Sequence, residues 1–208
     1  MIRKFAATIE GATPLLVNRY VEDIEVKDAI GAKPRDKSQE DVWRRSEALL
    51  RFHENGHGPF MPARNIRSAM IEGAHAAGIK HKTGRTQSKL GPYLRRGILI
   101  EPLELLFPPE VVKALTKARK VGVGDHKFPL LRDVVRIPPG PTGALVVKYW
   151  PKMEQWQFDF EISVFDDSLE SEGELKASLD AAGIFCGLGT GRPDFGKFAV
   201  SKWAEITE

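Results

Sequence analysis

The chain has 208 residues, a length that suits one domain carrying insertions and is too short for two domains of ordinary size. Hydrophobic residues make up 42% and charged residues 28%, so the composition excludes a disordered polymer and predicts a globular protein with a real core. Lys and Arg number 31 against 28 Asp and Glu, a formal charge of +3 that does not by itself indicate a polyanionic partner.

The first half of the chain predicts one strand and two helices. Residues 2–10 alternate as an opening strand does, and residues 21–37 carry no clear period, which predicts a loop. Apolar residues recur at helical spacing from Ser38, a plausible N-cap, to His53. A second helix is predicted over residues 64–77.

The second half predicts strands and two further helices. The expected elements are strands at 98–107 and 130–137 around a helix at 108–120, a hairpin of 144–150 with 155–165, a helix capped by Asp167, and a last strand at 197–206. This order predicts an α+β fold with a ferredoxin-like (RRM-like) antiparallel sheet, helices on one face and insertions in the first half. We expect one domain over residues 1–208, with a basic insertion at about 79–97 and a second insertion at about 108–151.

Residues 79–97, the basic arm, form the strongest local anomaly, because the segment IKHKTGRTQSKLGPYLRRG contains no Asp or Glu. Its cations are Lys80, Lys82, Arg85, Lys89, Arg95 and Arg96. Its Gly and Pro residues predict a mobile loop or an extended hairpin rather than a packed element. Cations on such an arm can follow a phosphate backbone, and Tyr93 offers a face on which a base can stack. The alternative is a solvated surface loop.

Residues 187–198, GLGTGRPDFGKF, form a second candidate site, the glycine loop. Its glycines, Gly187, Gly189, Gly191 and Gly196, let the backbone adopt positive dihedrals, and successive amides can cradle a phosphate. Arg192 and Lys197 would then meet a phosphodiester backbone. A P-loop is excluded because Phe198 stands where Ser or Thr must hold Mg²⁺, and a dinucleotide fingerprint fails because Arg192 replaces a required glycine.

The segment His53–His57, HENGH, matches the zinc-protease pattern, but Asn55 and Gly56 predict a turn between the two imidazoles. We expect a frayed helix end with His53 against the negative pole of the helix dipole. The lone Cys186 excludes an internal disulfide and a zinc site of several thiolates, and it reads as a small core residue in a reducing compartment. We expect no metal, no cofactor and no catalytic residue.

The order of these motifs resembles the RAMP superfamily, the ferredoxin-like RNA-binding proteins of CRISPR systems. The resemblance is carried by IEGATPLLV (9–17), MPARNIRSAMIEGA (61–74) and the glycine loop, in which Gly187, Gly189, Gly191, Gly196 and Lys197 carry the most specific mark. It is closest to the guide-RNA backbone subunit, in a short or divergent form expected of phage-borne genes. Some members are metal-independent endoribonucleases that use histidine, for which His53, His57 and His81 are the candidates near basic loops.

We expect a non-catalytic RNA or single-stranded nucleic-acid binding protein of a CRISPR-like or phage ribonucleoprotein assembly. The partners would be RNA or single-stranded DNA, copies assembled head to tail, or other effector subunits. The alternatives are an endoribonuclease of the same superfamily and a phage structural or assembly protein. No signal sequence or apolar run of the ~18–20 residues that cross a bilayer is present, so we expect a cytoplasmic protein without a membrane partner. The expectation requires the basic arm and the glycine loop to face the same side of the sheet.

Overall fold

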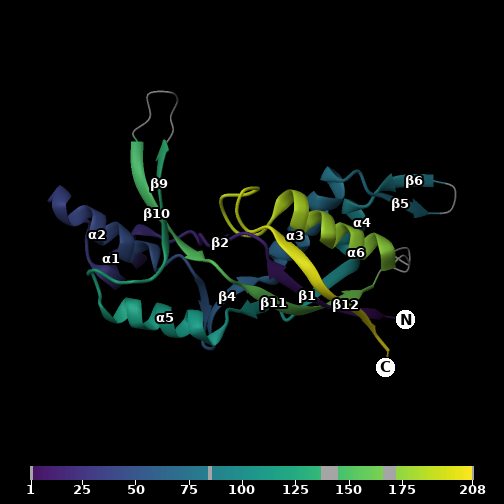
Figure 1. Ribbon diagram of the computed structural model, residues 1–208, viewed down its shortest axis with the longest axis horizontal. Coiled ribbons are helices and arrows are strands. Elements are labelled where there is room, and N and C mark those ends of the chain that lie inside the picture. Colours follow the sequence, from purple (N-terminus) through teal and green to yellow (C-terminus); the bar gives the residue numbers. More distant parts are fainter. Residues whose placement is uncertain (1, 84–85, 137–144, 166–171, 208) are drawn as a thin grey trace.

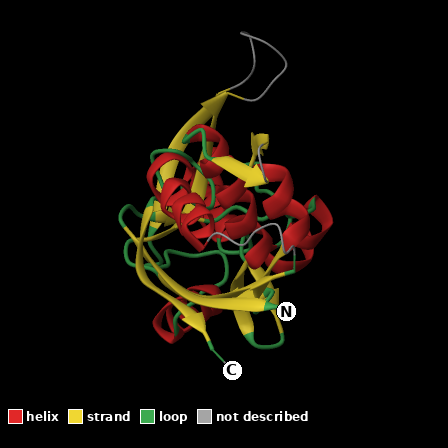
Figure 2. Ribbon diagram, turned by 90° about the vertical axis from the view of Figure 1, so that its right-hand side faces the viewer, coloured by secondary structure: helices red, strands yellow, loops and turns green. Residues whose placement is uncertain are grey.

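A four-stranded antiparallel sheet organises the computed structural model, which describes residues 2–83, 86–136, 145–165 and 172–207. The strands are β1 (Arg3–Gly11), β7 (Ile98–Glu101), β11 (Gln157–Val164) and β12 (Phe198–Ile206), in the order β12-β1-β11-β7. Helices α3 (Ala63–Ala76), α4 (Gly91–Gly97) and α6 (Glu172–Ala181) lie on one side of this sheet (Figures 1 and 2).

The connections confirm the predicted fold class. The chain runs β1, α3, β7, β11, α6, β12, and the first strand lies between the last strand and the third. This is the split arrangement of a ferredoxin-like sheet. The alternation that predicted β11 holds, because Phe158, Phe160 and Ile162 are buried while the residues between them face away from the helices.

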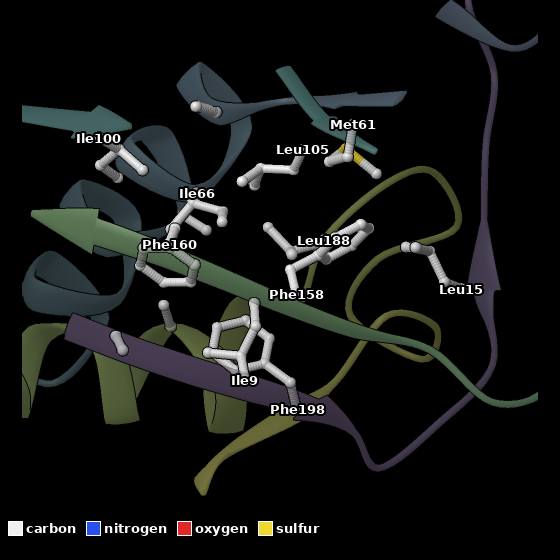
Figure 3. Packing of buried hydrophobic residues seen from close by; sticks show 14 of the residues in the cluster. Ile9, Leu15, Met61, Ile66, Ile100, Leu105, Phe158, Phe160, Leu188 and Phe198 are labelled. Atoms are coloured by element: carbon white, nitrogen blue, oxygen red, sulfur yellow. The ribbon is translucent and has the colours of Figure 1, made fainter. Parts of the chain in front are cut away.

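The core lies between the sheet and the helices. Phe5 and Ile9 of β1 and Ile162 of β11 are fully buried, and Ile66 of α3 packs against them from the helical side. Figure 3 shows Ile66 beside Phe160, and it shows Leu188 of the glycine loop among the same apolar side chains. The glycine loop is therefore held by the core and is not a free surface segment.

A second group of elements extends from one end of the sheet (Figure 1). Its helices are α1 (Asp23–Ile30), α2 (Lys37–Ala48) and α5 (Pro109–Lys120). One small sheet has the strand order β2 (Leu15–Leu16), β10 (Leu145–Met153) and β9 (Leu130–Arg136). The other has the order β3 (His53–Asn55), β4 (Gly58–Pro62) and β8 (Glu104–Leu106). The β9–β10 hairpin rises away from the body. The predicted hairpin of residues 144–150 with 155–165 is wrong, because β10 pairs with β9 and β2, whereas β11 pairs with β1 and β7. The helix predicted at 108–120 is confirmed, since α5 spans Pro109–Lys120.

Two predictions in the first half are wrong. Residues 21–37 contain helix α1, whose pattern is weak because only Val26 is buried, in a small cluster with Val21 and Trp43. The next helix ends at Ala48, and its N-cap is Asp36, whose side chain accepts from the Ser38 amide at 2.9 Å. His53 therefore lies in a strand and not at a helix end.

Some predicted features lie outside the described residues, namely Arg85 of the basic arm and the Asp167 cap of α6. Within the described ranges, no helix is both long and apolar enough to cross a membrane.

The packing of α3 against the segment after α6 gives a stability prediction. A Cβ on Gly73 would lie 2.7 Å from the Cα of Ala182, a backbone atom that cannot turn aside. Gly73→Ala should therefore lower the free energy of unfolding by about 2 kcal/mol, although alanine normally favours a helix. Urea denaturation measures this. Gly56→Ala, with no atom within 4 Å, is the control and should change stability by less than ~0.5 kcal/mol; equal effects of the two would refute the close packing.

Candidate nucleic-acid interface

Helix α3 connects the two segments that the sequence singled out. Asn65, Ser68, Glu72 and His75 recur at a spacing of three and four residues and form one stripe on its outer surface. The basic arm follows directly at the end of α3, and the glycine loop lies against its middle through an ion pair of Arg192 with Glu72. Both segments lie on the helical side of the sheet (Figure 1), as the sequence required.

The glycine loop has the predicted backbone, since all four of its predicted glycines have φ between 73° and 74°. Three amides of the loop, however, already donate hydrogen bonds within the protein and are not available to a phosphate. The amides of Leu188 and Thr190 donate to Gly196 and Leu16, and the Gly196 amide donates to Pro14. The last two hydrogen bonds fix the loop to β2 and to Pro14 just before it. A ligand would instead meet the side chains that the fixed loop presents.

A polar hollow of about 250 Å³ opens between the glycine loop and the start of α3. Its wall combines Arg19, His53, Asn65, Ser68 and Thr190 with the backbone of Gly189. These residues come from four separate parts of the chain, and apart from His53 the sequence gave no signal for the side chains. Arg19 also forms an ion pair with Glu25. Apolar side chains, among them Phe60 and Met61, line about as much of the hollow as polar groups do. The hydrogen-bond donors of Asn65, Ser68 and Thr190 are of a kind that suits phosphate and ribose.

His53 lies at the side of this hollow with a perturbed pKa. Burial lowers its pKa below the usual value, and the positive charges of Arg64 and Arg19 lower it further. The imidazole is therefore neutral near pH 7. Its neighbour in the motif, His57, lies across the β3–β4 turn, where the Asn55 side chain accepts from the His57 amide at 2.7 Å. The turn that argued against a zinc protease is confirmed, and no metal-binding cluster occurs among the described residues.

The basic arm is a hairpin followed by a helix and not a loose loop. Strands β5 (Lys80–Thr83) and β6 (Thr86–Lys89) pair, and α4 follows with Leu94 buried. His81 is 1% exposed, and its Nδ1 lies 2.7 Å from the Glu174 carboxylate of α6. The expectation of an unpacked segment is therefore wrong for residues 91–97 and for the base of the hairpin. The apolar contacts of Leu90 and Leu94 are the reason.

Two predicted site residues already have neighbours within the arm. The Tyr93 ring lies 4.2 Å from the His81 ring, and the Arg96 guanidinium lies 4.6 Å from the centre of the same tyrosine ring. The Tyr93 hydroxyl also accepts from Ser88 at 3.2 Å. Base stacking on Tyr93 thus stays a prediction. The side chain of Lys82 lies outside the description, although its backbone is in β5.

Arg192 does not offer a free charge, because its guanidinium lies 2.8 Å from Glu72 of α3. This corrects the expectation that the charges of the site are unopposed. Burial raises the pKa of the Cys186 thiol, and the Glu72 carboxylate raises it further. The thiol is thus protonated near neutral pH, which disfavours nucleophilic attack.

The open face of the sheet does not suit a polyanion. Asp159 and Glu161 of β11 project from it, and Glu161 lies directly opposite Glu101 of β7. The sheet aromatics Phe5 and Phe158 point into the core instead. A strand laid on this face, as bases lie on an RRM sheet, would meet carboxylates and no stacking platform.

The comparisons with known proteins give distant structural matches. No protein family model and no curated protein match the chain. A chain in a cryo-EM structure of the type III-B Cmr-beta bound to cognate target RNA is 12% identical, with a TM-score of 0.48; the match covers 99% of this chain and 61% of that one. The crystal structure of Cmr6 from Pyrococcus furiosus is 11% identical, with a TM-score of 0.46 and coverage of 96% and 99%.

The present chain thus spans less than two thirds of the first matched chain. We base no argument on matches this distant, and the ferredoxin-like fold rests on the strand order and connections above.

The environment of His53 gives a pH prediction. Its pKa in the folded chain should lie below 6.5, and Arg64→Gln should recover only the smaller part of the shift, because burial is its largest cause. The neutral imidazole then contributes stability that is complete above pH 6.5 and is lost as the pH falls through the lower folded pKa. Titration of the His53 Hε1 resonance by NMR measures this. A midpoint at or above 6.5 would contradict the buried position.

Proposed function

We propose that the chain binds RNA, or another single-stranded nucleic acid, without cutting it, as a component of a CRISPR-like ribonucleoprotein assembly. The strand would lie along the outer stripe of α3, from the polar hollow at its start to the basic arm at its end. One observation carries the proposal: cations without carboxylate partners gather along this side of the molecule.

Cations without carboxylate partners also occur in the second group of elements, since Lys113 and Lys117 of α5 have none among the described residues. The arginines of that group are largely paired, however, as in Arg44 with Glu40 and Arg51 with Glu47, each at 2.6 Å. On α3 and the arm, no ion pair with a described carboxylate involves the following cations: Arg64, Arg67, Lys80, Lys89 and Arg95. Such charges attract phosphates and release counterions when a strand binds.

The proposed path is bounded on both sides. On the glycine-loop side, Thr190 and the Gly189 backbone border the polar hollow, and the opposite wall is formed by Asn65 and Ser68. The loop is rigid, so it offers a fixed edge that costs little ordering on binding. Because phosphate contacts dominate, sequence preference should be weak.

The wider assembly belongs to the same proposal. Residues 1–208 act as a single RAMP-like domain with insertions at about 79–97 and 108–151, and the partners are RNA and effector subunits. The proposal has three further parts. The ligand can also be single-stranded DNA, copies of the chain assemble head to tail along the strand, and the gene is phage-borne. Among the site residues, the side chains of Lys82, Arg85 and Lys197 would add phosphate contacts.

A salt titration with matched variants tests the proposal. Lys80→Gln with Lys89→Gln removes two cations of the arm, and affinity for single-stranded RNA should fall about tenfold near 0.1 M salt. The slope of log K against log salt should flatten by about 1.4, since each phosphate contact on a single strand contributes ~0.7. Fluorescence anisotropy measures both values.

The control for this titration is Lys113→Gln with Lys117→Gln, which removes the same charge from exposed positions on α5. The control should bind as the unaltered chain does. Equal losses in the two double variants, or binding that ignores salt between ~50 and 200 mM, would contradict a phosphate site on the arm and favour a protein-binding role.

A second function, metal-independent RNA cleavage, is favoured by one observation, the neutral His53 in the polar hollow beside two arginines. A neutral imidazole can accept a proton from a ribose 2′-hydroxyl, and a guanidinium can stabilise the resulting charge. The test incubates end-labelled RNA with the protein in excess EDTA. Our first proposal predicts intact RNA that is only retarded; cuts that vanish in His53→Ala and persist in His57→Ala would establish the enzyme instead.

A further inference from the structure

A second hollow lies on the other side of Glu72 from the polar one, between α3 and the two parts of the basic arm, the β5–β6 hairpin and α4. Its volume is about 610 Å³, within the usual range for ligand sites. The floor is apolar and consists of Ile71, Ala74, Ile79, Leu90 and Pro92. We call it the apolar groove.

The rim of the apolar groove is cationic on two sides. Lys80 and Lys89 border it from the hairpin, and Arg95 and Arg96 border it from α4. Glu72 is the only carboxylate among its described lining residues, and it is held by Arg192. An apolar floor with positive charge on two sides suits a ligand with an apolar body and an anionic group.

The hairpin keeps two of these charges close together. Lys80 lies directly opposite Lys89 in the β5–β6 register, so both side chains project from the same face. Like charges at opposed positions destabilise a hairpin. The core residues that hold the arm, among them Leu90 and the His81–Glu174 pair, offset this repulsion. A phosphate between the two ammonium groups would relieve it.

The apolar groove also continues the proposed strand path. Ser68 borders the polar hollow, and Ile71, Glu72 and His75 border the groove one to two turns further along α3. At a rise of 1.5 Å per residue, Ser68 and His75 are separated by about 10 Å along the helix. The Glu72–Arg192 ion pair forms the wall between the two sites.

We propose that the apolar groove takes one unstacked nucleotide of the bound strand, with its base on the floor around Ile71 and its phosphate on the rim. The inference rests on the proposed function. A base unstacked from its neighbours has two apolar faces to bury, and its phosphate stays attached to the chain that the arm holds. The cations on two sides and the shared wall with the polar hollow favour this occupant over an isolated acyl chain, whose single anionic group could not meet Lys80, Lys89 and Arg95 together.

The test uses single-stranded oligoadenylate RNA of about 12 nucleotides, a length within known site sizes, with one 2-aminopurine moved along it. The base is quenched while it stacks on adenines. In saturating protein, the 2-aminopurine fluorescence should rise by at least about threefold at one position or more, because unstacking removes the quenching. Anisotropy of the same samples reports whether the strand is bound.

Three variants separate the groove from general phosphate binding. Ile71→Ser removes apolar floor and Pro92→Glu, at an exposed position, adds a carboxylate at the groove; each should abolish the fluorescence rise while saturating protein still binds the strand. Arg67→Gln, outside the groove, should weaken binding and leave the rise at saturation unchanged. Pro92→Glu keeps the test valid if Ile71→Ser unfolds.

The outcomes are distinct. No binding by the unaltered chain would overturn the proposed function and the inference with it. Binding with no rise at any position, or with a rise that survives both groove variants, would overturn the inference alone. A third result would also overturn the inference: phosphatidylglycerol vesicles bind at the groove, and RNA gives no change in 2-aminopurine fluorescence. The groove would then be a lipid-binding surface.

Discussion

The backbone after α6 lies against the middle of α3 at a separation that only glycine allows. A side chain on Gly73 would collide with Ala182, and one on Gly183 would lie 2.9 Å from the Phe198 ring. Because residues 182–186 lead directly into the glycine loop, this contact places the loop beside α3. The basic arm follows the C-terminal end of the same helix, close to Gly73, so one close approach between backbones positions both candidate binding segments.

The charge distribution then decides which surface can meet a polyanion. The open face of the sheet carries Glu101, Asp159 and Glu161, whereas cations without described partners gather around α3 and the arm. Lys202 also borders the open face, but carboxylates outnumber cations among the described residues there, so of the two sides of the sheet the helical side suits a polyanion better. Individual surface charges contribute little, but several on one path act together on a phosphate chain.

Much of the fold could be predicted because apolar residues recur with the period of a strand or of a helix along short stretches of the sequence. The alternation around Phe158 and Phe160 and the helical spacing around Ile66 and Met70 each reflect one buried face, which a single sequence displays. Helix α1 was not predicted because Val26 is its only buried residue, so its apolar residues show no clear period. Helix α4 escaped because Gly91 and Pro92 look like a turn, although proline is well suited to the first turn of a helix.

The candidate site was predicted less completely. The glycine positions and their dihedrals followed from the sequence, but the role of the amides did not, since their acceptors lie on residues 14–16, far away in the chain. The polar hollow joins Arg19, His53 and Ser68, and no spacing reveals such a meeting. Arg192 was predicted to be a free cation because its partner, Glu72, lies far away in the sequence.

The central claim is that a strand follows α3 on the helical side of the sheet. Ultraviolet crosslinking of 4-thiouridine-substituted single-stranded RNA, read by mass spectrometry of the peptides, tests it directly. The account predicts crosslinks in α3, the glycine loop and residues 79–97, and none in the outward-facing residues of β1 and β11. Crosslinks concentrated on the open sheet face, around Thr8 and Asp159, would contradict it.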